Sequence, residues 1–210
     1  LLAPDADLAP PDRDAAWQAR TAAGLAPESP YLLHVGTQQP RKNLRRLLEA
    51  FALAGAGRPD LQLVMAGMTG WGDEGLAGHA RALGLEGRVR ITGYFPRKLL
   101  AGLYGGATAL VMPSLYEGFG LPVVEAMACG TPVLCSGTSS LPEAAGGAAL
   151  LVDPLDVGAI AAGIRRLVED EPLRDELRGR GRMRASLLSW DSSARQVLGI
   201  LEEVARDAEG

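Results

Sequence analysis

The feature that most constrains the fold of this chain is a regular alternation of short apolar runs with longer amphipathic segments. Short, wholly apolar runs are typical of strands buried on both faces of a sheet, and the segments between them carry apolar residues at helical spacing. Residues 43–54 show that spacing, with Leu44, Leu47, Leu48 and Phe51 on one face. Repeated strand–helix–strand units favour a parallel sheet with helices on both faces. The predicted fold class is therefore α/β, a doubly wound parallel sheet of Rossmann-like type.

The alternation also predicts where each element lies. The predicted strands are residues 31–35, 61–66, 89–92, 109–112, 132–135 and 149–152. The predicted helices are residues 12–23, 43–54, a stretch within 74–83, 97–104, 121–129, 157–169, 173–186 and 192–206. Asn43 can cap the helix that it begins, and Gly55 and Gly57 end that helix. Right-handed crossovers between parallel strands place ligand chemistry in the loops after the strands.

Charge and composition exclude several classes of protein. A net charge of −4 argues against non-specific binding to nucleic acid. No apolar run approaches the roughly 20 residues that span a bilayer, and the first residues lack the basic start and apolar block of a signal peptide. We therefore expect a cytoplasmic protein. The basic stretch 178–184 (R-G-R-G-R-M-R) fits a solvated helix end, and a peripheral contact with the inner face of an anionic membrane stays open.

Cysteine and histidine give no sign of a metal centre. Cys129 and Cys135 lie close together in sequence, lack the spacing of a zinc site and are expected to be small buried residues. His79 is isolated, and His34 lies near the end of strand 31–35, where contact with a ligand stays open. We therefore expect neither a metal nor a cofactor.

Segment 113–130 carries the strongest chemical signal. Strand 109–112 ends at Pro113, and Gly118 and Gly120 form a loop before helix 121–129, whose first turn tolerates Pro122. The glycines allow the backbone to approach a ligand closely. The helix N-terminus offers unpaired N–H groups and the positive end of the helix dipole. The sequence therefore predicts a phosphate-binding site at the start of this helix.

Two carboxylates flank this predicted site. Glu117 precedes the loop and Glu125 lies about one turn into the helix, so both can accept hydrogen bonds from ligand hydroxyls. The arrangement fits a sugar on one side and a ribose on the other. Taken singly, each carboxylate also has a structural explanation, because a Glu in the first turns of a helix is favourable through the dipole alone. The spacing together with the glycines favours the binding interpretation.

The segment E-G-F-G-L-P-V-V-E-A-M-A-C-G-T-P-V resembles the signature of retaining GT-B glycosyltransferases, in particular glycosyltransferase family 4. The resemblance runs from about residue 31 to the end of the chain. It includes V-G-T-Q-Q-P-R-K-N (residues 35–43), S-S-L-P-E (residues 139–143) and S-W-D (residues 189–191). It implies a Rossmann-like C-terminal domain that binds a nucleoside-diphosphate sugar without a metal.

The resemblance also implies a role for individual residues. Glu117 would bind hydroxyls of the donor sugar, Glu125 would bind the ribose, and Arg41 and Lys42 would neutralise the diphosphate. The catalytic residues expected are thus Glu117, Arg41 and Lys42. The donor-binding residues expected are Gly36, Gly93, Tyr94, Phe95, Gly118, Phe119, Gly120, Leu121 and Glu125. The family places the nucleobase beside Tyr94 and Phe95, for which a place in the core is an equal alternative.

Enzymes of this family have two Rossmann-like domains, and the N-terminal one binds most of the acceptor; this chain holds one such unit. We expect residues 1–29 to be an interdomain linker with a short helix, and residues 30–188 to be the nucleotide-sugar-binding domain. Residues 189–210 form a helix expected to pack back toward the missing N-terminal domain. Without that partner the helix should expose the stripe Val197, Ile200, Leu201 and Val204, and the chain can self-associate.

The implied function is transfer of a hexose of mannose or glucose type to an acceptor glycan or lipid, with retention at the anomeric carbon. The chain alone should show little activity. Two alternatives stay open: a nucleotide-sugar epimerase of similar fold, and a non-catalytic module that binds a nucleotide sugar. An NAD-dependent dehydrogenase is disfavoured because no G-x-G-x-x-G follows the first strand. The base, the sugar and the acceptor are not assigned by the sequence.

Overall fold

A six-stranded parallel sheet organises the chain. The computed structural model describes residues 2–5, 7–26, 28–72 and 75–208, and its strands pair in the order β3-β2-β1-β4-β5-β6. Each pair of neighbours is parallel. The strands are β1 (Tyr31–Val35), β2 (Gln62–Ala66), β3 (Val89–Gly93), β4 (Ala109–Met112), β5 (Val133–Ser136) and β6 (Leu150–Val152). The predicted doubly wound α/β fold is confirmed.

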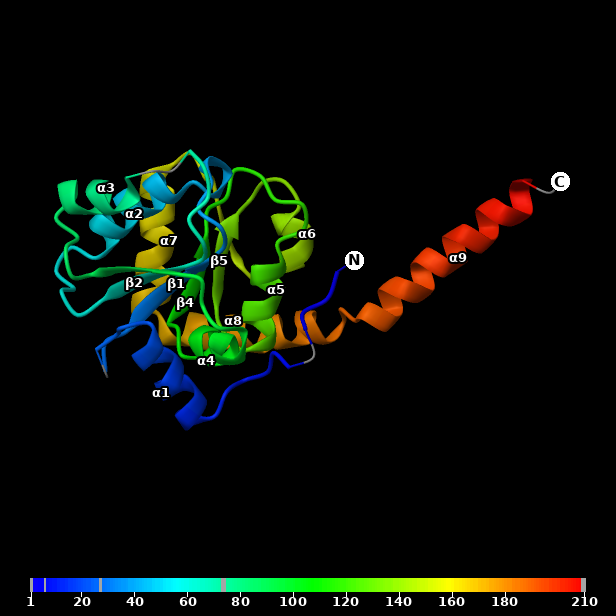
Figure 1. Cartoon of the computed structure of the whole chain (residues 1–210), viewed down its shortest axis with the longest axis horizontal. Helices are drawn as coiled ribbons and strands as arrows, with labels where there is room; N and C mark the ends of the chain where they lie inside the picture. Colours follow the sequence, from blue (N-terminus) through cyan, green and yellow to red (C-terminus); the bar gives the residue numbers. More distant parts are fainter. Residues whose placement is uncertain (1, 6, 27, 73–74, 209–210) are drawn as a thin grey trace.

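Helices cover both faces of this sheet (Figure 1). They are α1 (Arg13–Ala22), α2 (Leu44–Ala54), α3 (Leu76–Ala82), α4 (Leu100–Gly105), α5 (Leu121–Ala128), α6 (Leu141–Ala145), α7 (Val157–Glu169), α8 (Glu171–Ser186) and α9 (Trp190–Ala208). Helices α1, α4, α5 and α6 pack on one face, and α2, α3 and α7 pack on the other. Leu177 and Ala185 of α8 belong to the two different layers, so this helix joins them.

The central strands supply alternate residues to the two layers. Tyr31 and Leu33 of β1 pack under α1, α4 and α5, whereas Leu32 packs under α2 and α7. Strands β2, β4 and β5 are buried at every position. Burying one Leu side chain contributes about 1.5–3 kcal/mol. The fold therefore follows from the continuous apolar runs, which suit strands covered on both faces.

Most element boundaries lie within a few residues of those predicted, and the differences have local causes. Helix α6 was not predicted, because five residues are too few to show helical periodicity. The short 3-10 turn at Pro40–Lys42 was not predicted either. The helix predicted at residues 97–104 begins as a 3-10 turn at Arg97–Leu99 and continues as α4. The helix expected within residues 74–83 is α3, and Glu74 lies outside the described residues. No helix in the described part of the chain is long and apolar enough to cross a membrane.

Asn43 corrects one expectation about α2. It precedes the helix, but its side chain makes no capping hydrogen bond, because its backbone is left-handed (φ 60°, ψ 36°). Its amide nitrogen instead donates to the carbonyl oxygens of Pro113 at 2.9 Å and Pro154 at 2.7 Å. Asn43 therefore connects the loop after β1 to the loops after β4 and β6.

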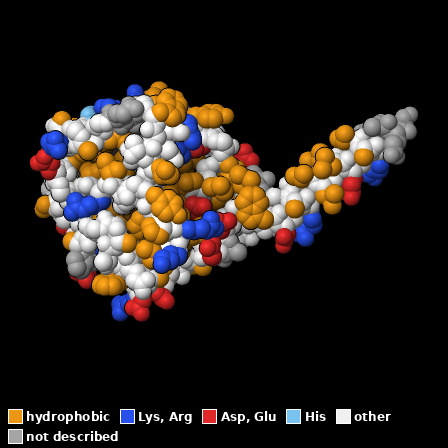
Figure 2. All heavy atoms as spheres, viewed as in Figure 1, with side chains coloured by type: hydrophobic (Ala, Val, Ile, Leu, Met, Phe, Trp, Pro, Cys, Tyr) orange, Lys and Arg blue, Asp and Glu red, His pale blue; other side chains and the backbone are white. Residues whose placement is uncertain are grey.

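Helix α9 extends away from the rest of the molecule (Figure 1). Val197, Ile200, Leu201 and Val204 are 57–60% exposed, and Figure 2 shows apolar side chains along the helix. The predicted apolar stripe is therefore present on the surface. The division of the chain into linker, binding domain and returning helix stays a prediction.

The N-terminal helix α1 packs directly on α4. Gly102 of α4 is the point of contact, where a Cβ would overlap the backbone oxygen of Ala15 and lie 2.9 Å from the Cβ of Ala19. Ala19 is fully buried in the same core cluster as Leu103. The helix in the predicted linker thus completes one layer of the fold.

Replacing Gly102 by Ala is expected to lower the free energy of unfolding by about 1–3 kcal/mol, because a backbone atom cannot rotate away from the new methyl group. Urea denaturation followed by circular dichroism measures the change. The matched control is Gly179→Ala in α8, where a Cβ meets nothing within 4 Å. The control should stabilise the protein by up to about 1 kcal/mol, as Ala normally does inside a helix. Equal destabilisation by both variants would contradict the direct α1–α4 contact.

Candidate functional site

The predicted site residues gather where the strand order reverses. β1 lies between β2 and β4, so its two neighbours are reached by crossovers in opposite directions. Parallel sheets bind ligands at such a switch point, outside the carboxyl ends of the strands. Arg41 and Lys42 follow β1, and Glu117 follows β4. The topology therefore brings together residues that are far apart in sequence.

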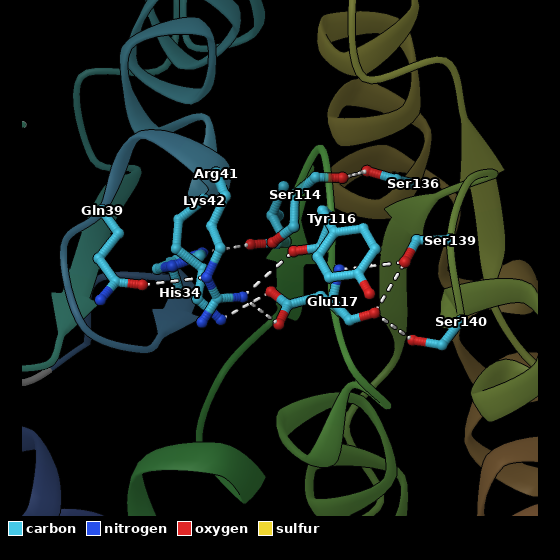
Figure 3. Close-up of polar contacts among 11 residues, drawn as sticks. His34, Gln39, Arg41, Lys42, Ser114, Tyr116, Glu117, Ser136, Ser139 and Ser140 are labelled. Carbon is cyan, nitrogen blue, oxygen red and sulfur yellow. Dashed lines mark hydrogen bonds and ion pairs between the residues drawn. The ribbon is translucent and has the colours of Figure 1, made fainter.

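The centre of the site is the carboxylate of Glu117 (Figure 3). Lys42 Nζ donates to Oε1 at 2.6 Å, and Arg41 Nη1 donates to Oε2 at 2.8 Å. The side chains of Lys42 and Glu117 are only 6% and 7% exposed, while that of Arg41 is 43% exposed. The three expected catalytic side chains therefore form one cluster, with Arg41 as its solvent-facing member.

Backbone hydrogen bonds hold this cluster in place. Leu115 N donates to Arg41 O at 2.7 Å, and the guanidinium of Arg41 donates to Tyr116 O at 3.1 Å. Ser139 Oγ, after β5, accepts from Glu117 N at 3.1 Å and donates to Glu117 O at 2.7 Å. Ser140 Oγ donates to the same oxygen at 3.0 Å (Figure 3). The loops after β1, β4 and β5 are thus joined around Glu117.

Ser139 and Ser140 belong to a segment that resembles the family, but the sequence predicts no role for them. Ser139 has a left-handed backbone (φ 59°), a rare conformation for a residue other than Gly. That conformation accompanies the paired hydrogen bonds of its hydroxyl to the backbone of Glu117. Two adjacent serines after a strand could have indicated a functional position. Sequence spacing does not reveal that they bind the backbone of Glu117.

Gly36 makes room for Lys42. Its backbone is in the glycine region (φ 151°), and a Cβ there would lie 3.2 Å from both Cε and Nζ of Lys42. Any side chain at position 36 would therefore compete with the buried lysine for space. The glycine expected to allow close approach of a ligand allows, in this structure, close approach of the lysine that pairs with Glu117.

The loop before α5, where a phosphate-binding site is predicted, ends at a glycine and at a helix start without a side-chain cap. Gly120 is left-handed (φ 96°), and no described side chain caps the helix that starts at Leu121. A Cβ on Gly118 would meet nothing within 4 Å, so the loop is open there. Phe119 and Leu121 instead pack against a small apolar cluster that contains Val124. Within this segment Gly118 is exposed, whereas Gly120 is buried.

Glu125 lies outside the Lys42 cluster. It points toward α4, where Tyr104 Oη donates to its Oε2 at 2.7 Å. Nearby, Tyr94 follows Gly93 at the end of β3 and is 72% exposed, whereas Phe95 packs against the core. The two aromatic residues therefore differ: Tyr94 is open to a ligand and Phe95 has the core position that was the alternative for both.

His34 has a defined place next to the cluster. Its ring is fully buried, and Nδ1 lies 3.1 Å from Val111 O, so Nδ1 must carry the proton that it donates. Burial is the main cause that lowers the pKa of His34 to about 4, and the charge of Lys42 lowers it further. Its Nε2 has no hydrogen-bond partner among the described residues. The imidazole is therefore neutral at physiological pH.

Glu117 stays ionised despite its burial. Burial by itself raises the pKa of this carboxyl, but the hydrogen bond and charge of Lys42 and the hydrogen bond of Arg41 are among the effects that lower it, and the net shift is downward. The site thus carries two cations and one carboxylate, which leaves it with a net positive charge. Such a site can accept an anion without a change of protonation.

The pH dependence of stability is expected to report His34. Between pH 6.5 and about pH 4 the His34 imidazole is protonated in the unfolded chain but neutral in the folded chain. The free energy of unfolding therefore falls as pH falls. The loss over that interval is about 3 kcal/mol. His34→Asn keeps a donor for Val111 but does not titrate, and urea denaturation at several pH values should show a shallower slope. His79→Asn on α3 is the matched control; the same flattening in both variants would contradict the assignment to His34.

Comparison with known proteins identifies the family. Residues 16–184 match the family model described as glycosyl transferases group 1. The O-antigen chain mannosyltransferase B of Escherichia coli is 43% identical over 169 residues, which are 80% of this chain and 44% of that protein. The D-inositol 3-phosphate glycosyltransferase of Thermomonospora curvata is 38% identical over 199 residues, covering 90% of this chain and 46% of that one. The chain spans about half the length of these relatives.

Solved structures share the fold. Sucrose-phosphate synthase from Thermosynechococcus elongatus superposes with a TM-score of 0.83 at 30% identity, over 98% of this chain and 52% of that chain. Anabaena HepE in complex with UDP-glucose superposes with a TM-score of 0.85 at 22% identity, over 96% of this chain and 56% of that one. The C-terminal domain of a group 1 glycosyl transferase from Francisella tularensis gives a TM-score of 0.70 at 23% identity, over 86% of this chain and 94% of that one. The chain belongs to the group 1 family of glycosyl transferases, and it has the fold of their C-terminal domain.

Proposed function

We propose that this chain is the donor-binding half of a retaining glycosyltransferase. The longer enzyme would transfer a hexose of mannose or glucose type from a nucleoside-diphosphate sugar to an acceptor glycan or lipid. The observation that carries the proposal is the cluster of Lys42, Arg41 and Glu117 in front of the uncapped start of α5. The cluster combines two cations for a diphosphate with one carboxylate for sugar hydroxyls.

Donor binding would proceed by an exchange of partners. Without a ligand, both cations are satisfied by Glu117. A diphosphate would bring charge to Lys42 and Arg41 and leave the carboxylate free to accept hydrogen bonds from the sugar. The cations would then stabilise the negative charge that develops on the leaving nucleoside diphosphate. Arg41, which is 43% exposed, can reach the ligand first.

The rest of the donor would extend along the same edge of the sheet. Backbone N–H groups of residues 118–121 would contact the sugar and the diphosphate. Glu125 would accept hydrogen bonds from the ribose, and Gly93, Tyr94 and Phe95 would line the base, with the exposed Tyr94 making the larger contact. Gly36 would contribute by leaving space for Lys42.

The proposed hexose donor and glycan or lipid acceptor agree with the names of similar proteins. One relative is named an O-antigen chain mannosyltransferase, and HepE was solved with UDP-glucose. The acceptor would bind mainly to an N-terminal domain, toward which the apolar stripe of α9 would pack. We place the enzyme in the cytoplasm, with peripheral membrane contact as an open alternative. Arg178 and Arg180 do not favour that contact, because they pair with Asp175 and Glu176.

Calorimetric titration of this chain with UDP, GDP and ADP is expected to show binding of at least one of them. Lys42→Met should weaken that binding about tenfold or more, because a charge-assisted hydrogen bond to phosphate is lost. The matched control is Arg165→Met, which removes an exposed cation on α7 and should leave the affinity unchanged. An equal effect of both variants would mean that Lys42 acts only through the overall charge of the protein and not through a specific contact. Failure to bind any of the three nucleotides would overturn the proposal.

In the longer enzyme, Glu117→Ala is expected to lower the rate of sugar transfer by at least about a hundredfold, because the carboxylate would contact the transferred sugar. Transfer is measured by analysis of the glycosylated product, and the anomeric configuration of that product tests retention. Unchanged transfer would remove Glu117 from the mechanism. The 210-residue chain alone should bind donor but show little transfer, and turnover at an ordinary rate would contradict the division into donor and acceptor halves. A changed sugar in the nucleotide product would instead indicate an epimerase.

A further inference from the structure

Tyr104 and Glu125 form a hydrogen bond whose donor is buried and held in place. Tyr104 is fully buried, and its Oη lies 2.7 Å from Glu125 Oε2. The backbone of Tyr104 is also held, because Thr131 Oγ1 donates to Tyr104 O at 2.7 Å. The ring therefore has one position, and its hydroxyl has one acceptor.

The direction of this hydrogen bond is fixed. A carboxylate can only accept, so the phenol must donate. Burial, together with the neighbouring charge of Glu125, raises the pKa of Tyr104 far above its usual range, so the donor proton is present at every working pH. Glu125 is itself only partly exposed. One carboxylate oxygen is thus occupied by Tyr104, and within the described part of the chain no hydrogen bond occupies the other oxygen.

We propose that Tyr104 is a positioning residue for ribose recognition: it holds one oxygen of Glu125 so that the other oxygen accepts the ribose hydroxyls. This inference rests on the proposed function, in which Glu125 contacts the ribose. Without the phenol, the Glu125 side chain can rotate about its own bonds, and a rotating acceptor loses affinity because binding must then fix its rotamer. Tyr104 would not touch the nucleotide.

The test compares a ribonucleotide with an analogue that lacks the ribose hydroxyls. The chain is titrated with UDP and with 2′,3′-dideoxy-UDP, and likewise with GDP and its dideoxy analogue. The wild-type protein is expected to bind the ribonucleotide about tenfold more tightly, as for hydrogen bonds to a charged group. In Tyr104→Phe this preference should fall to about twofold, mainly by weaker binding of the ribonucleotide.

Tyr31→Phe is the matched control. Tyr31 is also fully buried and its hydroxyl also donates one hydrogen bond, but to a backbone carbonyl of α4 rather than to Glu125. The control should lose stability as Tyr104→Phe does, and it should keep the tenfold preference. A merely structural role for Tyr104 predicts the same preference in both variants, and that result would overturn the inference alone. A wild-type protein without any preference would overturn the ribose role of Glu125 and the inference with it.

A measurement on the wild-type protein covers the case in which Tyr104→Phe does not fold. A buried phenol that donates to a carboxylate exchanges its proton slowly, so its hydroxyl resonance is observable by NMR. This resonance should shift when UDP or GDP binds and should stay in place when the dideoxy analogue binds. Equal shifts with the two ligands would overturn the proposed coupling of Tyr104 to the ribose.

Discussion

The buried ion pair between Lys42 and Glu117 is the interaction on which the rest of the site depends. The side chains of both residues are at most 7% exposed, so each charge has lost most of its hydration and is compensated by the other. Removing one partner of a buried pair costs about 3–5 kcal/mol, because the remaining charge is left uncompensated. The contact therefore joins the loops after β1 and β4, because moving either loop away would leave a buried charge uncompensated on the other. Any anionic ligand that displaced Glu117 from Lys42 would have to satisfy the same requirement.

The surrounding polar groups make this arrangement available before any ligand arrives. Asn43 holds the carbonyls of Pro113 and Pro154, and Ser139 holds both backbone groups of Glu117. Buried backbone groups need partners from the backbone, from side chains or from water. Here side chains of neighbouring loops supply them, so the ends of β1, β4, β5 and β6 form one network. A site held in this way loses little freedom when it binds, which is the advantage of preorganisation.

Periodicity predicted the fold, because buried strands are continuous apolar runs. The choice of Arg41, Lys42 and Glu117 came from the resemblance to the family, and it agrees with the rule that the loops after β1 and β4 meet at one edge of a parallel sheet. The roles of Asn43, Ser139 and Tyr104 could not be predicted. Each depends on a single side-chain direction or a left-handed backbone, and neither is encoded in spacing. Helix α6 was missed because its five residues are shorter than two helical turns.

The two glutamates of the Glu-x7-Glu segment illustrate how environment separates identical side chains. Burial raises the pKa of both carboxyls, but Glu117 is paired with two cations and its net shift is downward. Glu125 is held by a neutral phenol, which only partly offsets burial, so its net shift is upward. As pH falls, Glu125 is therefore the first of the two to lose its charge. The end of the site assigned to the ribose would weaken before the end assigned to the diphosphate and sugar. The hydrogen bond from Tyr104 opposes that loss, because it favours the ionised carboxylate. The phenol of Tyr104 thus favours the ionised form of Glu125, as Lys42 favours the ionised form of Glu117.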